Sequence, residues 1–96
     1  MILDIEVLPR PTGTPEERYA HVEAAIAVIQ RSGLHFEVHA LGTTVEGDPD
    51  LIWELARRIH DATLVAGAES VVTIAKFQQS RLSDPPTMAS LTAKFR

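Results

Sequence analysis

The sequence predicts a single α+β domain in which four strands form an antiparallel sheet and two helices cover one of its faces. Segments that alternate like strands and segments with helical periodicity follow one another in the order strand, helix, strand, strand, helix, strand. Glycine and proline stand at the boundaries between them. This βαββαβ order is the ferredoxin-like pattern, and right-handed crossovers place both helices on the same face of the sheet.

The first strand is predicted over residues 2–8, where apolar and acidic residues alternate. A loop rich in proline and glycine follows. The first helix is predicted to begin at Thr14, because threonine can cap a helix and the proline and two glutamates after it suit a first turn. It is predicted to end near Ser32. Its apolar stripe is expected to comprise Tyr19, Val22, Ile26 and Ile29.

Two strands are predicted to follow without a long loop between them. Alternation over 34–40 indicates the second strand, and Gly42 marks a tight hairpin or bulge before the third. The second helix is predicted over 50–66 and the fourth strand over the β-branched run 71–77. The apolar side of that helix is expected to contain Ile52, Leu55, Ala56, Ile59, Ala62 and Thr63.

Residues 1–81 are therefore expected to form the domain, and residues 82–96 a C-terminal tail. A break at Asp84 and the two prolines after it precedes a short amphipathic helix, predicted over 87–95. Such a tail either frays or docks on a neighbouring subunit. The face of the sheet away from the helices is left open and polar, and small sheets with such a face often pair with a second subunit. We expect a homodimer or homotetramer.

The bulk composition narrows the class of protein. The chain has 96 residues, of which 45% are hydrophobic and 23% charged, as in an ordinary globular domain. Its net charge of −4 argues against binding to nucleic acid, which needs a clustered positive face. The sequence contains no cysteine and shows neither a signal peptide nor a membrane-spanning stretch. We expect a cytoplasmic protein without disulfides or membrane partners.

Three segments carry a resemblance to a known family: Ile5–Pro9, the pair Ser32–Leu34 and Leu41–Gly47, and Gly67–Thr73. With these segments, the sequence resembles the small thiamine-binding protein family, also called the YkoF-like group. The resemblance spans most of residues 1–81. It implies a ferredoxin-like subunit that assembles as dimers and tetramers. It also implies binding of thiamine, or of its hydroxymethylpyrimidine part, without catalysis.

Thr43 and Glu46 match the Gly-Thr-x-x-Glu-Gly motif of that family, and the resemblance makes them the leading ligand contacts. A carboxylate can accept a hydrogen bond from the amino group of the pyrimidine or balance the thiazolium charge, and a threonine hydroxyl can complete the pattern. Spacing alone favours an ordinary strand residue at Thr43, and at Glu46 a charge that is solvated or paired across subunits. The motif match brings ligand binding to equal weight.

Four further residues are weaker candidates for ligand binding. Glu6 lies on a central strand, where a carboxylate needs water, a partner or a ligand. His39 and Thr73 lie on strands that can reach a pocket in the sheet, and Trp53 can stack on a pyrimidine ring. Their ordinary alternatives are exposure, strand formation and packing.

No catalytic or metal-binding motif is found. His35 and His39 share a face, but four residues of a strand span about 13 Å, too far for one metal ion. The sequence holds no nucleophile elbow and no glycine-rich phosphate loop. We therefore expect a protein that is not an enzyme and takes no cofactor beyond its ligand. The alternatives are a regulatory domain of the same fold that senses another metabolite, and a scaffold protein without a small ligand.

Overall fold

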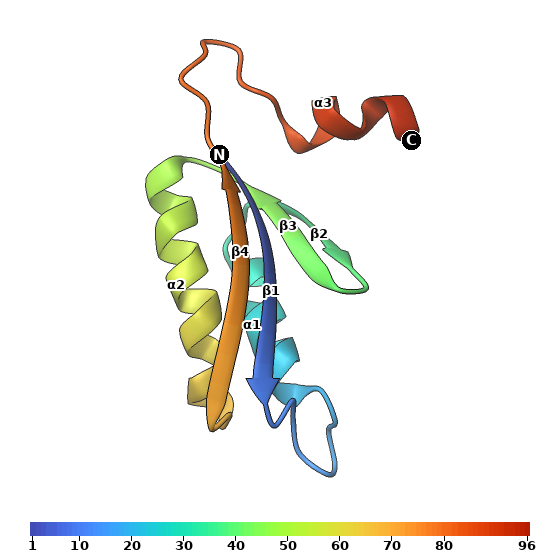
Figure 1. Cartoon of the computed structure of the whole chain (residues 1–96), viewed down its shortest axis with the longest axis vertical. Helices are drawn as coiled ribbons and strands as arrows, with labels where there is room; N and C mark the ends of the chain where they lie inside the picture. The colour runs from blue at the N-terminus through green and yellow to red at the C-terminus, as the bar shows by residue number, and fades with distance from the viewer.

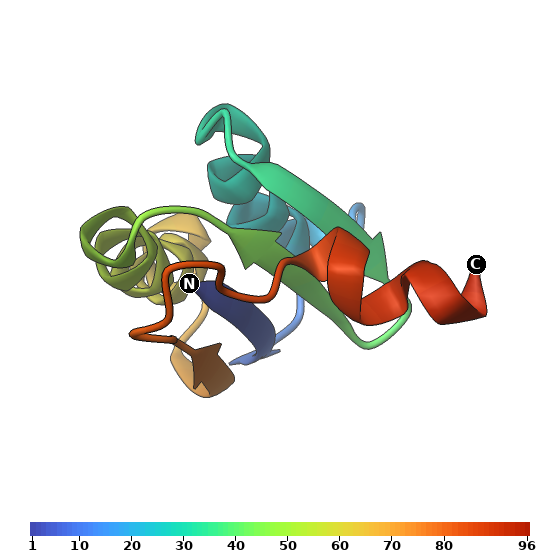
Figure 2. The same cartoon turned by 90° about the horizontal axis from the view of Figure 1, so that it is seen from above.

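The computed structural model describes residues 1–96 and confirms the ferredoxin-like α+β fold. A four-stranded antiparallel sheet has the order β2-β3-β1-β4, and α1 and α2 cover one of its faces (Figures 1 and 2). The elements are β1 (Ile2–Arg10), α1 (Ala20–Arg31), β2 (His35–His39), β3 (Gly42–Glu46), α2 (Pro49–Ala66), β4 (Ser70–Gln78), α3 (Met88–Thr92) and the 3₁₀ helix η1 (Ala93–Phe95). None of the helices has the length and apolarity that a membrane crossing requires.

The core lies between the helices and one face of the sheet. Because side chains alternate along a strand, β1 sends Leu3 and Ile5 toward the helices and Asp4 toward the opposite face. The helices close the core with apolar residues at helical spacing. The core cluster consists of Leu3, Ile5, Ala25, Ile29, Val45, Ile52, Leu55 and Ile59. The predicted apolar side of α2 is confirmed by this packing.

Helix α1 begins at Ala20, six residues after the predicted start. Thr14 does accept a hydrogen bond from the backbone N–H of Glu17, at 3.0 Å, but this bond closes an isolated turn. The loop is held instead by His21, whose backbone N–H donates to the carbonyl oxygen of Thr12 at 2.9 Å and whose Nδ1 donates to that of Pro11 at 2.7 Å. These contacts hold the residues predicted as the first helical turns in an irregular loop. The capping pattern in the local sequence does not predict these contacts.

Helix α2 matches its prediction closely. Proline at position 49 occupies the first turn, and the helix ends at Gly67, whose φ of +128° lies in the region that favours glycine. A Cβ atom at Gly67 would lie 3.1 Å from Nε2 of His21, which is itself 4% exposed. Gly67 therefore ends α2 and also lets the start of α1 pack closely against that end.

The tail folds back on its own sheet. Helix α3 lies across the end of the sheet where β1 begins and β3 ends (Figures 1 and 2). The N–H of Met88 donates to Oε2 of Glu46 at 2.8 Å, and Met88 is 6% exposed. Both terminal nitrogens of the Arg96 guanidinium donate to the carboxylate of Glu37 at 2.8 Å. Of the side chains predicted for the apolar side of this helix, only Met88 is buried, and Leu91 and Phe95 stay exposed.

Strands β1 and β3 differ in length, and this difference positions the site. β1 pairs with β4 over its whole length, from Ile2 to Arg10. It pairs with β3 only from Ile2 to Ile5, because the β2–β3 hairpin turns back at Gly42. The second half of β1 therefore has no neighbouring strand on that side.

Candidate functional site

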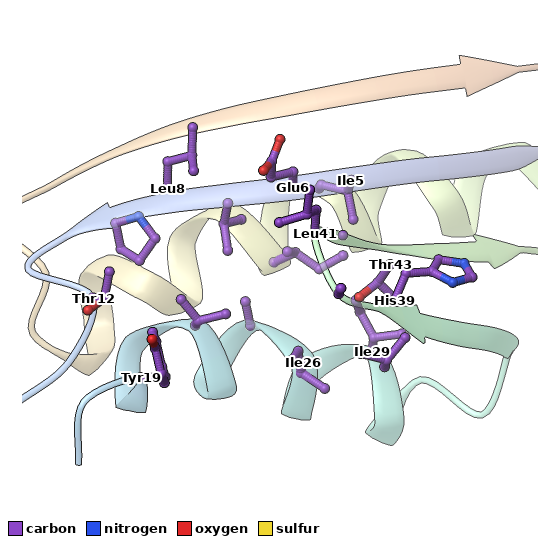
Figure 3. Close-up of a pocket in the computed structure, with 18 of the residues that line it drawn as sticks. Ile5, Glu6, Leu8, Thr12, Tyr19, Ile26, Ile29, His39, Leu41 and Thr43 are labelled. Atoms are coloured by element: carbon purple, nitrogen blue, oxygen red, sulfur yellow. The ribbon is translucent and has the colours of Figure 1, made fainter.

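A cavity of about 490 Å³ occupies the gap that the short hairpin leaves beside β1 (Figure 3). This volume falls within the range of small-molecule sites, roughly 300–1,000 Å³. Its walls are the second half of β1, the tip of the β2–β3 hairpin and one side of α1. The lining residues are Ile5–Arg10, Thr12, Tyr19, Val22, Ala25, Ile26, Ile29, Val38–Thr43 and Ile59.

The floor of the cavity is the apolar stripe of α1. Val22 and Ile26 were predicted to face the core, yet they are only half-buried, because their outer surfaces border the cavity. Ile29, one turn further along, is 1% exposed and belongs to the core. Val22, Ile26 and Ile29 were therefore predicted correctly as one apolar side of the helix, but part of this side lines a ligand-sized space and not packed protein. Tyr19 does not belong to it, because it precedes the helix and is 55% exposed.

Few polar side chains border this apolar space. Thr43 is 4% exposed and lines the cavity, and its hydroxyl makes no hydrogen bond within the chain. Because no buried side-chain oxygen or nitrogen lacks a partner, this hydroxyl is open to the cavity. Glu6 is the only carboxylate in the lining, and Arg10 is the only permanent cation. The ring of Tyr19 lies at the end of the cavity near Thr12 and is 55% exposed (Figure 3). The cavity thus offers an apolar floor, one free hydroxyl and charges at its margin.

The structure brings three of the six predicted site residues together. Thr43, Glu6 and His39 all line the cavity. Thr43 points toward α1, whereas Glu6 projects from the opposite side of β1 (Figure 3). His39 lies at the rim, and its Nε2 is 4.0 Å from Oε2 of Glu37 on the open face.

The other three predicted residues lie outside this cavity, and each has a partner within the chain. Glu46 points to the face opposite Thr43, because the two positions differ by an odd number along β3, and it accepts the hydrogen bond from Met88. The hydroxyl of Thr73 lies 2.6 Å from Nδ1 of His60 on α2. The indole of Trp53 stacks on the ring of Phe77, with centroids 4.1 Å apart. Their role in ligand binding stays a prediction.

Most residues of the cavity were not predicted as site residues, and Tyr19 and Arg10 are two of them. Tyr19 was assigned to the core stripe of the first helix, and its position before the true start of α1 turns its ring to the cavity. Arg10 lies between two prolines, at the end of a strand that is two residues longer than predicted. The Pro-Arg-Pro sequence after a strand was a signal that this loop is ordered and rigid, but it gave no indication of a ligand.

Comparison with known proteins identifies the family. Residues 3–95 match the sequence profile of the family described as "Thiamine-binding protein". The chain belongs to this family. A UPF0045 protein of Synechocystis is 32% identical over 88 residues, which cover 92% of this chain and 70% of that protein. The resemblance found in the sequence is thereby confirmed.

Solved structures show the same architecture. A domain of unknown function, DUF77, from Bacillus cereus has a TM-score of 0.85 and 34% sequence identity, with 99% of this chain and 88% of that chain covered. A protein from Thermotoga maritima has a TM-score of 0.81 at 21% identity, with 99% and 97% covered, and this second likeness concerns the fold alone.

Proposed function

We propose that this protein binds thiamine, or its hydroxymethylpyrimidine part, in the cavity between α1, β1 and the β2–β3 hairpin, without converting it chemically. The family to which the chain belongs supports the class of ligand. The cavity beside the second half of β1 supports the place, and this is the observation that carries the proposal. The biological role would be buffering, delivery or sensing of the vitamin.

The chemistry of thiamine suits this lining. Its two flat, carbon-rich rings can pack on the apolar floor formed by Val22 and Ile26. The exposed ring of Tyr19 offers a face on which a cationic thiazolium can lie. The free hydroxyl of Thr43 can donate to or accept from a nitrogen group of the pyrimidine, and Glu6 can balance the positive charge.

Removing the hydroxyl of Thr43 tests the buried polar contact. In Thr43→Val the side-chain shape is kept, so the fold should persist while a ligand group loses its partner. We expect thiamine affinity to fall by about 5- to 50-fold. Isothermal titration measures this change, and circular dichroism confirms that the variant is folded. Unchanged affinity in a folded variant would remove Thr43 from the site.

Charge removal at Glu6 has a matched control on the same strand. Glu6→Gln should weaken thiamine binding and reduce its dependence on salt, because a charge partner of the cation is lost. Asp4→Asn removes the same charge two residues away on the same face. Asp4 bonds the hydroxyl of Thr44 at 3.0 Å and lies 3.6 Å from Nζ of Lys76, outside the cavity. Equal effects of the two substitutions would contradict a specific role of Glu6.

A further inference from the structure

The cavity touches the edge of β1 as well as a face of it. Six consecutive strand residues, Ile5–Arg10, line it. Side chains of consecutive strand residues point to opposite faces, so a space that borders only one face would touch every second residue. Contact with all six residues means that the free edge of the strand, where backbone N–H and C=O groups emerge, forms part of the wall.

The register of the sheet identifies the backbone groups at that edge. In an antiparallel ladder the N–H and C=O of one residue point to the same neighbouring strand, and those of the next residue point the other way. Met1 exchanges two hydrogen bonds with Gly47, at 3.0 and 3.1 Å, so odd-numbered residues of β1 face β3. The carbonyl oxygen of Arg10 accepts from the N–H of Glu69 at 2.8 Å, so even-numbered residues face β4.

Val7 is the odd-numbered residue that follows the end of the β1–β3 ladder. Ile5 is the last residue of β1 with a partner on β3, namely Thr43. Val7 has a partner on β4, Thr73, but none on the side where its own N–H and C=O point. The next residue with this orientation, Pro9, has no N–H. Val7 therefore presents the one complete donor–acceptor pair on the free edge of β1 that lines the cavity.

We propose that the backbone N–H and C=O of Val7 recognise the aminopyrimidine ring of the ligand, which takes the place of the missing residue of β3. The ring nitrogen N3′ accepts from the N–H of Val7, and the 4′-amino group beside it donates to the carbonyl oxygen. The ring then lies in the plane of the sheet with one face on the floor formed by α1. This inference rests on the proposed function and assigns its specificity to the strand edge.

The same geometry disfavours a peptide strand as the occupant. An added strand gains its affinity from a series of main-chain hydrogen bonds along an exposed edge. Here Pro9 interrupts the series after Val7, and the helix α1 closes the space on one side. One donor–acceptor pair at the edge of an apolar cavity fits a small heteroaromatic ring.

The first test exchanges the donor and acceptor on the ligand. In the 4′-oxo analogue of thiamine, oxythiamine, an acceptor replaces the amino group and N3′ carries a proton. Both groups then oppose those of Val7 unless the ring turns over, which displaces the thiazolium. We expect oxythiamine to bind the wild-type protein about 10- to 100-fold more weakly than thiamine. Equal affinities overturn the inference while the proposed function stands, and no thiamine binding at all overturns both.

The second test removes the donor from the protein. Val7→Pro deletes a backbone N–H that makes no ladder bond, and proline is tolerated where a strand N–H faces away from its neighbour. Val7→Ala is the matched control, because it shortens the side chain but keeps the N–H. We expect Val7→Pro to bind thiamine about 10-fold or more weakly than Val7→Ala does. Indistinguishable affinities in the two folded variants overturn the inference.

Amide hydrogen exchange measured by NMR tests the wild-type protein and does not depend on any variant folding. Without ligand, the N–H of Val7 should exchange faster than those of Glu6 and Leu8, which face β4. Saturating thiamine should slow the exchange of Val7 most. If Val7 exchanges no faster than its two neighbours in the free protein, or stays unprotected with thiamine bound, the inference is wrong.

Discussion

Gly13 has no space for a side chain in the loop that leads into α1. A Cβ atom there would lie 2.2 Å from the carbonyl oxygen of Glu17 and 2.5 Å from that of Arg18. Since such distances cannot be tolerated, Gly13→Ala must deform the loop that brings Thr12 and Tyr19 to the cavity. We expect the free energy of unfolding to fall by about 1–3 kcal/mol and thiamine affinity to fall with it. Urea denaturation and calorimetry measure the two effects.

Gly33 provides the control for this prediction. Its φ is +75°, and nothing lies within 4 Å of the position of its Cβ atom. Gly33→Ala should cost about 1 kcal/mol from the left-handed backbone alone and should leave ligand binding unchanged. If both substitutions destabilised the fold equally and neither affected binding, the prediction that a side chain at Gly13 deforms the loop would be wrong.

At the scale of single residues, the sequence predicted which residue types belong to the site better than it predicted where their side chains point. The motif singled out Thr43, which lines the cavity, together with Glu46, which lies on the opposite face. Because side chains alternate along a strand, those of residues three positions apart point to opposite faces of the sheet. By contrast, the partner of Glu46 comes from Met88, and the partner of His21 from Pro11. Such contacts depend on how distant segments pack, and no local pattern reveals them.

The tail is an element with a clear local signal and an unexpected partner. Thr87 caps α3 through a reciprocal pair of hydrogen bonds with Ser90, which explains why a helix as short as Met88–Thr92 begins where it does. Its contacts with Glu46 and Glu37 lie on the open face of its own sheet. At the first helix, by contrast, Thr14 accepts the predicted capping hydrogen bond, but the helix does not begin there.

The contact between Arg96 and Glu37 predicts a dependence of tail docking on pH. The hydrogen bonds from Arg96 hold the pKa of Glu37 below its usual range. The charge of Arg96, and to a smaller extent those of His39 and His35, act in the same direction, while partial desolvation opposes them. A carboxylate with a lowered pKa in the folded state stabilises docking above the usual glutamate pKa, about 4.3, and this contribution is lost as the pH falls through the lowered pKa.

A titration of the Glu37 side chain followed by NMR measures this effect. In Arg96→Ala the pKa of Glu37 should rise toward the usual value, and the resonances of the last residues of the tail should lose the pH dependence that follows Glu37. Lys94→Ala removes an exposed cation two residues away and serves as the control. A Glu37 pKa that is the same in the wild type and in Arg96→Ala would contradict the docked arrangement of the tail.

At the scale of the whole molecule, the order of elements was sufficient to predict the topology. Alternation placed Asp4 and Glu37 on the open face, and the register confirms this arrangement, with Asp4 and Glu37 both opposite Thr44. The cavity was not predictable in the same way. It arises because β3 has five residues and β1 has nine, so the free edge at Val7 reflects a difference in strand length and not a residue type.

The open face also bears on assembly. Tail contacts occupy its β2–β3 side, and the β1–β4 side presents three apolar side chains to solvent. Leu8, Val72 and Ile74 are 44%, 61% and 50% exposed. Leu8 lies directly opposite Val72, and Ile74 lies opposite Glu6, so the three form one patch on neighbouring strands. An apolar patch rimmed by polar residues is typical of a protein–protein contact. We propose that a second copy of the chain covers it.

A charge in the middle of this patch should separate the subunits without unfolding them. Ile74 is half exposed in the single chain, so Ile74→Lys can place its ammonium group in water when the subunit is free. In an assembled dimer the same group would be removed from water, with only Glu6 on the neighbouring strand as a partner, and association should weaken by about 10-fold or more. Analytical ultracentrifugation over a concentration series measures this change. Val65→Lys, at an 87% exposed position on α2, should leave association unchanged. An oligomer that survives Ile74→Lys, or a wild-type chain that stays monomeric at millimolar concentration, would show that the patch is not the subunit contact.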